Sequence, residues 1–391
     1  MNMDENLKDA VKLCRVCRAA VVPGSKFPEI TGDDLERIYE GATKHMLEVM
    51  VGDCILSYNR IEPQSKMAKK IRQKINASIY RMLVSDTERT ALYDFFDKHK
   101  IWYLPLKGQI LRDYYPKPYY RQMGDYDFLY DGSFQKIVEQ HMEENGFVHE
   151  ESSRIDQSFR KDIVHFELHR ALSTGTDDYK EMLDYYNGKK TNFLLEDVSE
   201  NSRYKRRLSA DDFYIYFVTH AFKHYSFMSG IGIRYLVDLY VFQNKMSDVL
   251  DFSYIEKELC KVNAKAFESY SRKLAQKLFS SDEELELERE EADILVRLFN
   301  GGVYGERNNL HQYRVKRLKE NGRVTMGKYI QSRLFPPEWQ MEQVYPWSSK
   351  SRLYLLAAYM TRFFHALKSS VRFLEEIREI NGILHEKSRD E

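Results

Sequence analysis

The 391-residue chain has little cysteine, proline or glycine and no excess of charge of either sign. Four cysteines are too few and too scattered for a disulfide framework, and Cys14-x-x-Cys17 lacks the second ligand pair of a zinc site. We therefore expect this pair to be two thiols in an amphipathic helix. With 18 Gly and 9 Pro and a hydrophobic content of 43%, disordered and low-complexity chains are also excluded.

The charge balance and the absence of long apolar runs restrict the partners. Sixty Lys and Arg balance sixty Asp and Glu, whereas proteins that follow long nucleic acids usually carry a basic excess. No run approaches the ~20 consecutive apolar residues that span a bilayer, and the polar start lacks a signal-peptide core. We expect a cytoplasmic protein with neither a long nucleic acid nor a membrane as partner.

The hydrophobic pattern divides the chain into three regions. Residues 1–99 show helical spacing, residues 100–208 alternate short strands and helices, and residues 209–391 return to helical spacing. The expected fold class is α+β, with a small mixed-sheet core embedded in a mostly helical chain. A basic stretch at 314–328 is expected to be an exposed connector, although contact with an anionic ligand is an alternative.

Local signals predict the elements of the middle region and the helices after it. Apolar runs at 101–106, 125–130, 147–152 and 162–170 predict strands. One helix should follow the first strand and stop before Pro116, and another should run from a Ser133 cap to Gly146. Ser209 is expected to cap a long helix, with 232–245 as its helical partner.

Two aspartates carry the strongest chemical signal. Asp125 and Asp127 are two apart on an expected strand, so their carboxylates should point to the same face and repel each other. A divalent cation such as Mg²⁺, which prefers hard oxygen ligands, would stabilise the pair. The alternative is that both residues merely flank a turn.

Residues on either side of this pair add to the signal. Lys107 and Gly108 lie where a strand turns into a helix, a place suited to phosphate because Gly108 allows close approach and Lys107 adds positive charge. Downstream, Glu167 should share a strand face with His165 and His169. A third carboxylate there would complete a two-metal site of the kind that clamps a triphosphate.

The long helix after residue 209 contains a second polar cluster. His220, Lys223 and His224 occupy one helix face, and Arg234 and Asp238 are four residues apart on the next helix. Zinc binding is disfavoured because the metalloprotease glutamate is missing between the histidines. A polar helix face with an Arg–Asp pair is one alternative, and a contact with nucleotide or acceptor is the other.

These motifs resemble those of the DNA polymerase beta-like nucleotidyltransferase superfamily, and more closely its bacterial branch described as uncharacterised nucleotidyltransferases. The resemblance is carried by L-K-G at 106–108, R-Q-M-G-D-Y-D at 121–127, and F-E-L-H at 166–169. A signature H-x-x-K-H…R-x-x-x-D in the following helices is similar as well. The broad superfamily has Gly-Ser or Gly-Gly where this chain has Gly108-Gln109.

The resemblance implies roles for the residues of these motifs. The metal-binding and catalytic group would be Asp125, Asp127 and Glu167, with Glu167 also orienting or deprotonating an acceptor hydroxyl. Binding of the nucleotide would fall to Lys107, Gly108, Arg121, Gly124, His220, Lys223, His224, Arg234 and Asp238. Because the serine of the broad superfamily is absent, Lys107 or Arg121 would take its place on the phosphates.

The resemblance also implies a reaction. An Mg²⁺-dependent enzyme, with Mn²⁺ as the alternative ion, would transfer an NMP group from an NTP to a small-molecule or protein acceptor and release pyrophosphate. Two alternatives remain open. One is a noncatalytic nucleotide-sensing or partner-binding protein on the same fold, and the other is a toxin-like protein adenylyltransferase.

Overall fold

The computed structural model describes most of the chain. The described residues are 3–30, 32–152, 156–172, 180–188, 196–197, 203–228, 230–280, 285–305, 325–368 and 377–381. The expected connector at 314–328 lies largely outside these residues, as does much of the segment between 173 and 208.

A five-stranded mixed sheet forms the centre of the α/β region, in the order β1-β2-β5-β4-β3. Strands β2 and β5 are parallel and the other pairs are antiparallel. The α+β class is therefore confirmed. The strands are β1 Tyr103–Pro105, β2 Tyr126–Tyr130, β3 Val148–Ser152, β4 Asp156–Lys161 and β5 Val164–His169, and a separate two-stranded sheet pairs β6 Glu196–Asp197 with β7 Arg206–Arg207.

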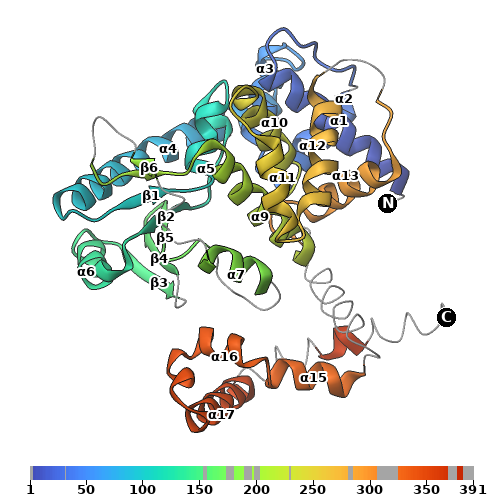
Figure 1. Cartoon of the computed structure of the whole chain (residues 1–391). Helices are drawn as coiled ribbons and strands as arrows, with labels where there is room; N and C mark the ends of the chain where they lie inside the picture. The colour runs from blue at the N-terminus through green and yellow to red at the C-terminus, as the bar shows by residue number, and fades with distance from the viewer. Residues whose placement is uncertain are drawn as a thin grey trace.

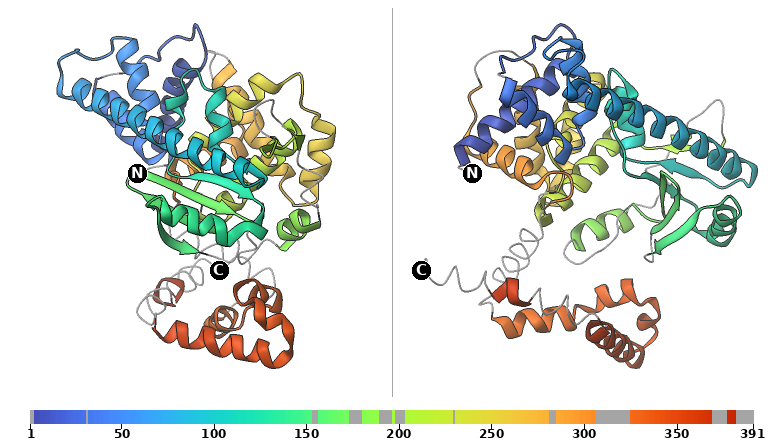
Figure 2. Two further views of the ribbon diagram at one scale, coloured as in Figure 1. Left: turned by 90° about the vertical axis from the view of Figure 1, so that its left-hand side faces the viewer. Right: turned by 180° about the vertical axis from the view of Figure 1, so that it is seen from behind.

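Alternation along the strands directs side chains to two faces of the sheet that pack in different hydrophobic clusters. On β2, Tyr126, Phe128 and Tyr130 belong to a hydrophobic cluster that includes Phe96 of α4 (Lys66–Lys98) and Val138 of α6 (Gln135–Glu144). Figures 1 and 2 show α4 running along the sheet, with α6 beside it. Period-two alternation sends the intervening residues to the opposite side, where Asp127 lies and where Leu129 joins the core of the helical region.

Helices that precede the sheet region in the chain share one core with helices that follow it. Helix α1 contacts α12 and α13, and the Arg18 Nε donates to the Phe279 carbonyl at 3.0 Å across 261 residues. The first and third of the expected regions are thus packed together (Figure 1). The helices of this part are α1 Met3–Val21, α2 Gly32–Lys44, α3 Glu48–Ser57, α9 Ala210–Met228, α10 Arg234–Met246, α11 Phe252–Cys260, α12 Lys265–Ser280 and α13 Arg289–Gly301.

Several local expectations can be checked directly. Both thiols of the Cys14-x-x-Cys17 pair are buried in α1, as expected. The Ser209 hydroxyl accepts from the Asp212 amide at 3.1 Å and caps α9. The Ser133 cap was wrong, because α6 begins at Gln135 and the Asp131 carboxylate instead caps the preceding 3₁₀ turn by accepting from the Ser133 amide at 3.0 Å.

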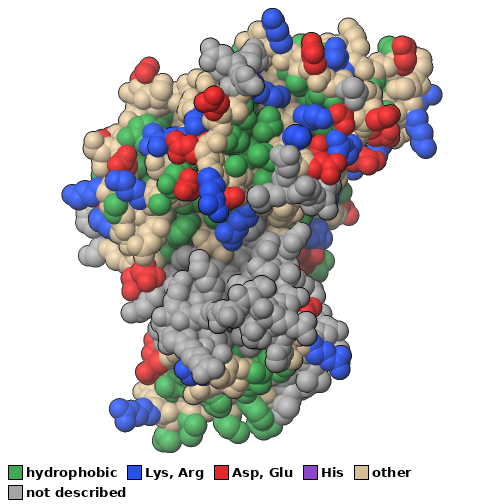
Figure 3. Space-filling view, turned by 90° about the vertical axis from the view of Figure 1, so that its right-hand side faces the viewer, with side chains coloured by type: hydrophobic (Ala, Val, Ile, Leu, Met, Phe, Trp, Pro, Cys, Tyr) green, Lys and Arg blue, Asp and Glu red, His purple; other side chains and the backbone are tan. Residues whose placement is uncertain are grey.

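A separate group of helices lies near the C-terminus, and its helix α17 contacts the other two. The group comprises α15 Met326–Leu334, α16 Glu338–Val344 and α17 Arg352–Lys368. Helix α17 exposes Leu353, Leu356, Met360 and Phe364. Figure 3 shows hydrophobic side chains along the lower edge of the molecule, where this unit lies. Among the described helices, none combines the length and hydrophobicity needed to cross a bilayer.

Three chain segments, at His45, Gly232 and Gly302, lie against one another where the N-terminal helices meet α10 and α13. Gly232 has a φ of +62°, and a Cβ placed on it would lie 2.9 Å from the His45 Nδ1 and 3.2 Å from the Gly302 carbonyl carbon. The His45 ring is fully buried, and its Nδ1 accepts from the Ile233 amide at 3.3 Å. A residue without a side chain is therefore required at position 232.

We expect Gly232→Ala to lower the free energy of unfolding by about 1–3 kcal/mol, because it combines an unfavourable φ with a steric clash. Chemical denaturation would measure the loss. Gly41→Ala is the matched control, since this helical glycine has open space around it and no positive φ. Equal stability of the two variants would contradict the packing argument.

The same crossing predicts a pH dependence of stability. Burial lowers the pKa of His45 from 6.5 to about 3. Between pH 3 and 6.5, His45 is therefore protonated in the unfolded chain but neutral in the folded chain. As the pH drops below 6.5, this difference should lower the free energy of unfolding by about 1.4 kcal/mol per pH unit. His45→Gln should reduce this slope between pH 6 and 5, whereas the exposed His149→Gln should not.

Candidate active site

The carboxylates converge through the register of two parallel strands. Asp127 on β2 lies directly opposite Glu167 on β5. Asp125 immediately precedes β2, and its carboxylate, the His165 ring and the Glu167 carboxylate have ligand atoms within 4.8 Å of one another. The Asp127, Glu167 and His169 side chains form a second group of this kind. The expected three-carboxylate cluster is thus present.

Asp127 is the buried centre of the cluster and is only 4% exposed. Its Oδ1 accepts from the Lys107 Nζ at 2.6 Å and lies 2.8 Å from the His169 Nε2. Burial would raise the pKa of Asp127, but Lys107 and His169 hold it well below its usual range. Burial would likewise lower the pKa of Lys107, but Asp127 raises it above its ordinary value. Both groups are therefore charged at neutral pH.

The other two carboxylates experience mutual repulsion. Burial and the nearby Asp127 and Asp125 raise the pKa of Glu167 to about 8. Burial and Asp127 also raise the pKa of Asp125. The cluster is thus short of positive charge despite the presence of Lys107.

A pocket of about 190 Å³, here called the carboxylate pocket, joins this cluster to the helical region. Lys107, Glu167 and His169 line one side of it. One face of α9 lines another side and contributes Tyr216, Thr219, His220, Lys223 and His224, while α7 (Lys180–Gly188) contributes Met182 and Tyr186. The two motifs that the sequence suggested separately therefore meet in one pocket.

The two histidines of α9 are neutral and in mutual contact. Their Nε2 atoms lie 3.3 Å apart. Burial lowers the pKa of His220 well below its usual value, and burial together with Lys223 lowers the pKa of His224 to about 4. Within the described residues, neither histidine belongs to a group of three metal-binding side chains. They can offer hydrogen bonds to a ligand without adding charge.

Five of the nine expected nucleotide-binding residues do not line the carboxylate pocket, and three of them are charged residues that lie near one another. The Arg121 Nε donates to the Asp238 Oδ1 at 2.7 Å, and the Tyr115 hydroxyl donates to the same oxygen at 2.7 Å. The Arg234 Nη1 donates to the Gln122 carbonyl at 3.1 Å. Asp238 thus holds Arg121 of the 118–126 segment, and the role of these residues in nucleotide binding stays a prediction.

The two glycines of the motifs differ in their surroundings. Gly108 is buried at the start of α5 (Gly108–Leu111), and a Cβ there would lie 3.0 Å from the Met123 Sδ. Close packing is therefore one reason for this glycine, and Lys107 before it adopts a φ of +51°. Gly124 has open space around its Cα. The expected phosphate contacts of both glycines stay predictions.

The donor set suits a hard divalent cation. Three carboxylates supply oxygen atoms of the kind that Mg²⁺ and Mn²⁺ take. The elevated pKa of Glu167 is the local sign of uncompensated negative charge, which bound cations would relieve. The residues present therefore fit the ions that the motifs suggested.

Comparison with known families agrees with this geometry. Residues 31–280 match the family described as "Uncharacterised nucleotidyltransferase". The chain belongs to this nucleotidyltransferase family. Searches of curated proteins and of solved structures returned no significant match. The family relationship suggested by the motifs at 106–108, 121–127 and 166–169 is thereby confirmed.

The sequence patterns assigned no role to several residues at this candidate site. His169 belongs to the F-E-L-H motif and was expected to share the Glu167 face, but its contact with Asp127 requires knowledge of the β2–β5 register. Tyr216 and Thr219 lie one turn before His220 and Lys223, so helical spacing could have found them. Asp156 comes from β4, a strand that was not predicted.

The Arg121–Asp238 pair gives a stability prediction. Asp238→Asn keeps the shape of the side chain but leaves the buried Arg121 without a carboxylate, and we expect a loss of about 3 kcal/mol in the free energy of unfolding. Denaturant titration would measure it. Glu150→Gln, which breaks the exposed pair with Arg160, should leave stability nearly unchanged. A loss as small as that of the control would show that the buried pair contributes little.

Proposed function

We propose that the protein is a nucleotidyltransferase that moves an NMP group from an NTP to a hydroxyl-bearing acceptor and releases pyrophosphate, with Mg²⁺ or Mn²⁺ as cofactor. The observation that carries the proposal is the register that sets Asp127 beside Glu167, which lines a pocket shared with His220, Lys223 and His224. Membership in the nucleotidyltransferase family supports it.

The three carboxylates would hold the divalent cations. Asp127 and Glu167 face each other across the strand pair, and Asp125 completes the group. When bound, the cations would neutralise the triphosphate and the charge that develops on the attacking and leaving oxygens. The β2–β5 pairing gives these ligands a rigid support, because both strands lie inside the sheet.

Cationic and neutral donors on the pocket wall would hold the triphosphate. Lys107 and Lys223 bring positive charge from opposite walls. His220 and His224, kept neutral by burial, would donate hydrogen bonds to phosphate or sugar oxygens. Tyr186 and Tyr216 supply aromatic surface that suits a sugar or a base.

Glu167 is the best placed group to accept the proton of the acceptor hydroxyl. Its side chain is 31% exposed, more than that of Asp127, so it can meet an incoming substrate. A carboxylate positioned within reach of the acceptor hydroxyl can take its proton as the hydroxyl attacks. His169, 3.7 Å from the Glu167 Oε2, would hold this carboxylate in position.

The proposal predicts metal-dependent binding of an NTP. We expect at least one of ATP, GTP, CTP and UTP to raise the thermal midpoint by several degrees in the presence of Mg²⁺ or Mn²⁺, since a ligand at ~100 times its dissociation constant stabilises by about 2.7 kcal/mol. Asp127→Asn and Glu167→Gln should abolish the shift, which differential scanning fluorimetry would measure.

Asp113→Asn is the matched control, because this aspartate is 74% exposed and belongs to a 3₁₀ turn near the motif. It should retain the full shift. A shift of the same size in Asp127→Asn and wild type would refute the metal assignment. The absence of a shift with any NTP and either ion would count against nucleotide binding itself.

A further inference from the structure

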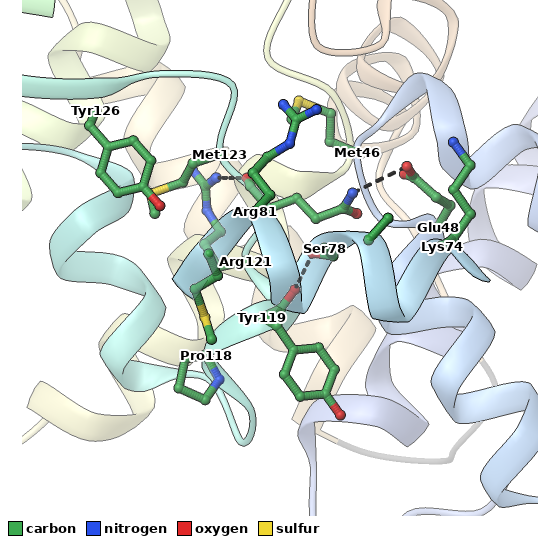
Figure 4. A pocket seen from close by; sticks show the side chains of 13 residues that line it. Met46, Glu48, Lys74, Ser78, Arg81, Pro118, Tyr119, Arg121, Met123 and Tyr126 are labelled. Atoms are coloured by element: carbon green, nitrogen blue, oxygen red, sulfur yellow. Dashed lines mark hydrogen bonds between the residues drawn. The ribbon is translucent and has the colours of Figure 1, made fainter. Parts of the chain in front are cut away.

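A second pocket lies next to the carboxylate cluster. It has a volume of about 260 Å³ and is here called the α4 pocket. Its walls come from helix α4, from the segment that leads into β2, and from the Met46–Glu48 turn before α3 (Figure 4). The residues that line it are Met46, Glu48, Lys74, Ala77, Ser78, Arg81, Met82, Pro118, Tyr119, Arg121, Gln122, Met123 and Tyr126.

Two cations of the α4 pocket have no carboxylate partner. Lys74 and Arg81 are seven residues apart on one helix face, and among the described residues no ion pair or hydrogen bond joins either to another group. Figure 4 shows both side chains extending from α4 toward the side where Met46 and Glu48 lie. The stretch 66–81 contains six Lys or Arg and no Asp or Glu. This wall therefore favours an anion.

The opposite wall offers a hydrogen-bond acceptor. The Glu48 Oε1 accepts from the Gln122 Nε2 at 3.2 Å, while its Oε2 has no partner. Glu48 is only 8% exposed, so an unpaired carboxylate oxygen there is costly. A ligand hydroxyl or amino group would satisfy it. The pocket thus combines a cationic end with an acceptor for a donor group.

The α4 pocket and the carboxylate pocket are separate cavities. They share no lining residue, and the chain from Arg121 to Asp127 runs from the wall of the α4 pocket to the carboxylate cluster. Arg234 connects the two places, since it contacts the Gln122 carbonyl and the Met46 Sδ and raises the local positive charge near Asp125. In nucleotidyl transfer the attacking and leaving oxygens are roughly in line, so donor and acceptor must approach from different sides.

We propose that the α4 pocket binds the acceptor, and that this acceptor is a small molecule with an anionic group, such as a phosphate monoester, together with hydroxyl or amino groups. Lys74 and Arg81 bind the anionic group, and Glu48 binds a hydroxyl or amino group. The acceptor role rests on the proposed function, whereas the anion site does not. A long polyanion is disfavoured because only two of the six cations of 66–81 line the pocket.

Inorganic phosphate is the first probe. Calorimetric titration at constant ionic strength, without metal or nucleotide, should show binding that Lys74→Gln/Arg81→Gln weakens by at least about tenfold, because two charged donors are lost. Lys69→Gln/Lys98→Gln is the matched control, since it makes the same charge change on the same helix at exposed positions outside the pocket. It should change the affinity by less than about twofold.

Three results would overturn the anion site. Equal weakening in both double variants would mean diffuse attraction to the helix. Loss of binding in Lys223→Gln with retention in Lys74→Gln/Arg81→Gln would place the anion in the carboxylate pocket. A lack of phosphate binding by the wild type would mean that the α4 pocket is not an anion site.

Glycerol 3-phosphate tests the second half of the ligand. It should bind more tightly than inorganic phosphate to the wild type, and Glu48→Gln should remove most of this advantage while leaving phosphate binding intact or stronger. Equal affinity of the two probes in the wild type would overturn the role of Glu48. Normal phosphate binding without any NTP-dependent thermal shift would refute the nucleotidyltransferase function and the acceptor role. It would leave the anion site intact, so failure of the proposed function can be told apart from failure of the anion site.

Discussion

The parallel pairing of β2 with β5 is the constraint on which the candidate site depends. It sets Asp127 opposite Glu167 and at the same time sends Phe128 and Phe166 to the apolar face. A shift of one residue in this register would bury the carboxylates among aromatic rings and expose those rings. The hydrophobic packing on one face of the sheet therefore fixes the register that brings the carboxylates together on the other face.

The negative charge gathered around Asp127 and Glu167 is met by cations and hydrogen-bonding groups that come from several parts of the fold. Lys107 comes from the β1–α5 turn, His169 from the end of β5, and Lys223 from α9. The Arg121–Asp238 contact attaches the 118–126 segment to α10. Sheet and helical region are thus joined by buried charges as well as by apolar packing, and small relative movements of the two would change the site directly.

Much of the fold and site follows from local patterns in the sequence. Alternation predicted β2 and β5, and the spacing of His220, Lys223 and His224 placed them on one helix face. β4 was missed because Asp156–Lys161 contains a single large apolar residue, Phe159. The pairing of Arg121 with Asp238 could not be foreseen either, because 117 residues separate them and only the tertiary fold brings them together.

The core shared by α1, α12 and α13 has a consequence for how the chain folds. Contacts such as that of Arg18 with the Phe279 carbonyl join residues more than 250 positions apart, so this part of the core cannot form from local contacts alone. During synthesis from the N-terminus, α1 can pack against α2 and α3 early, but it leaves the ribosome long before α12 and α13 exist. The surface of α1 that α12 and α13 cover therefore stays exposed, or is shielded by a chaperone, until most of the chain has been translated.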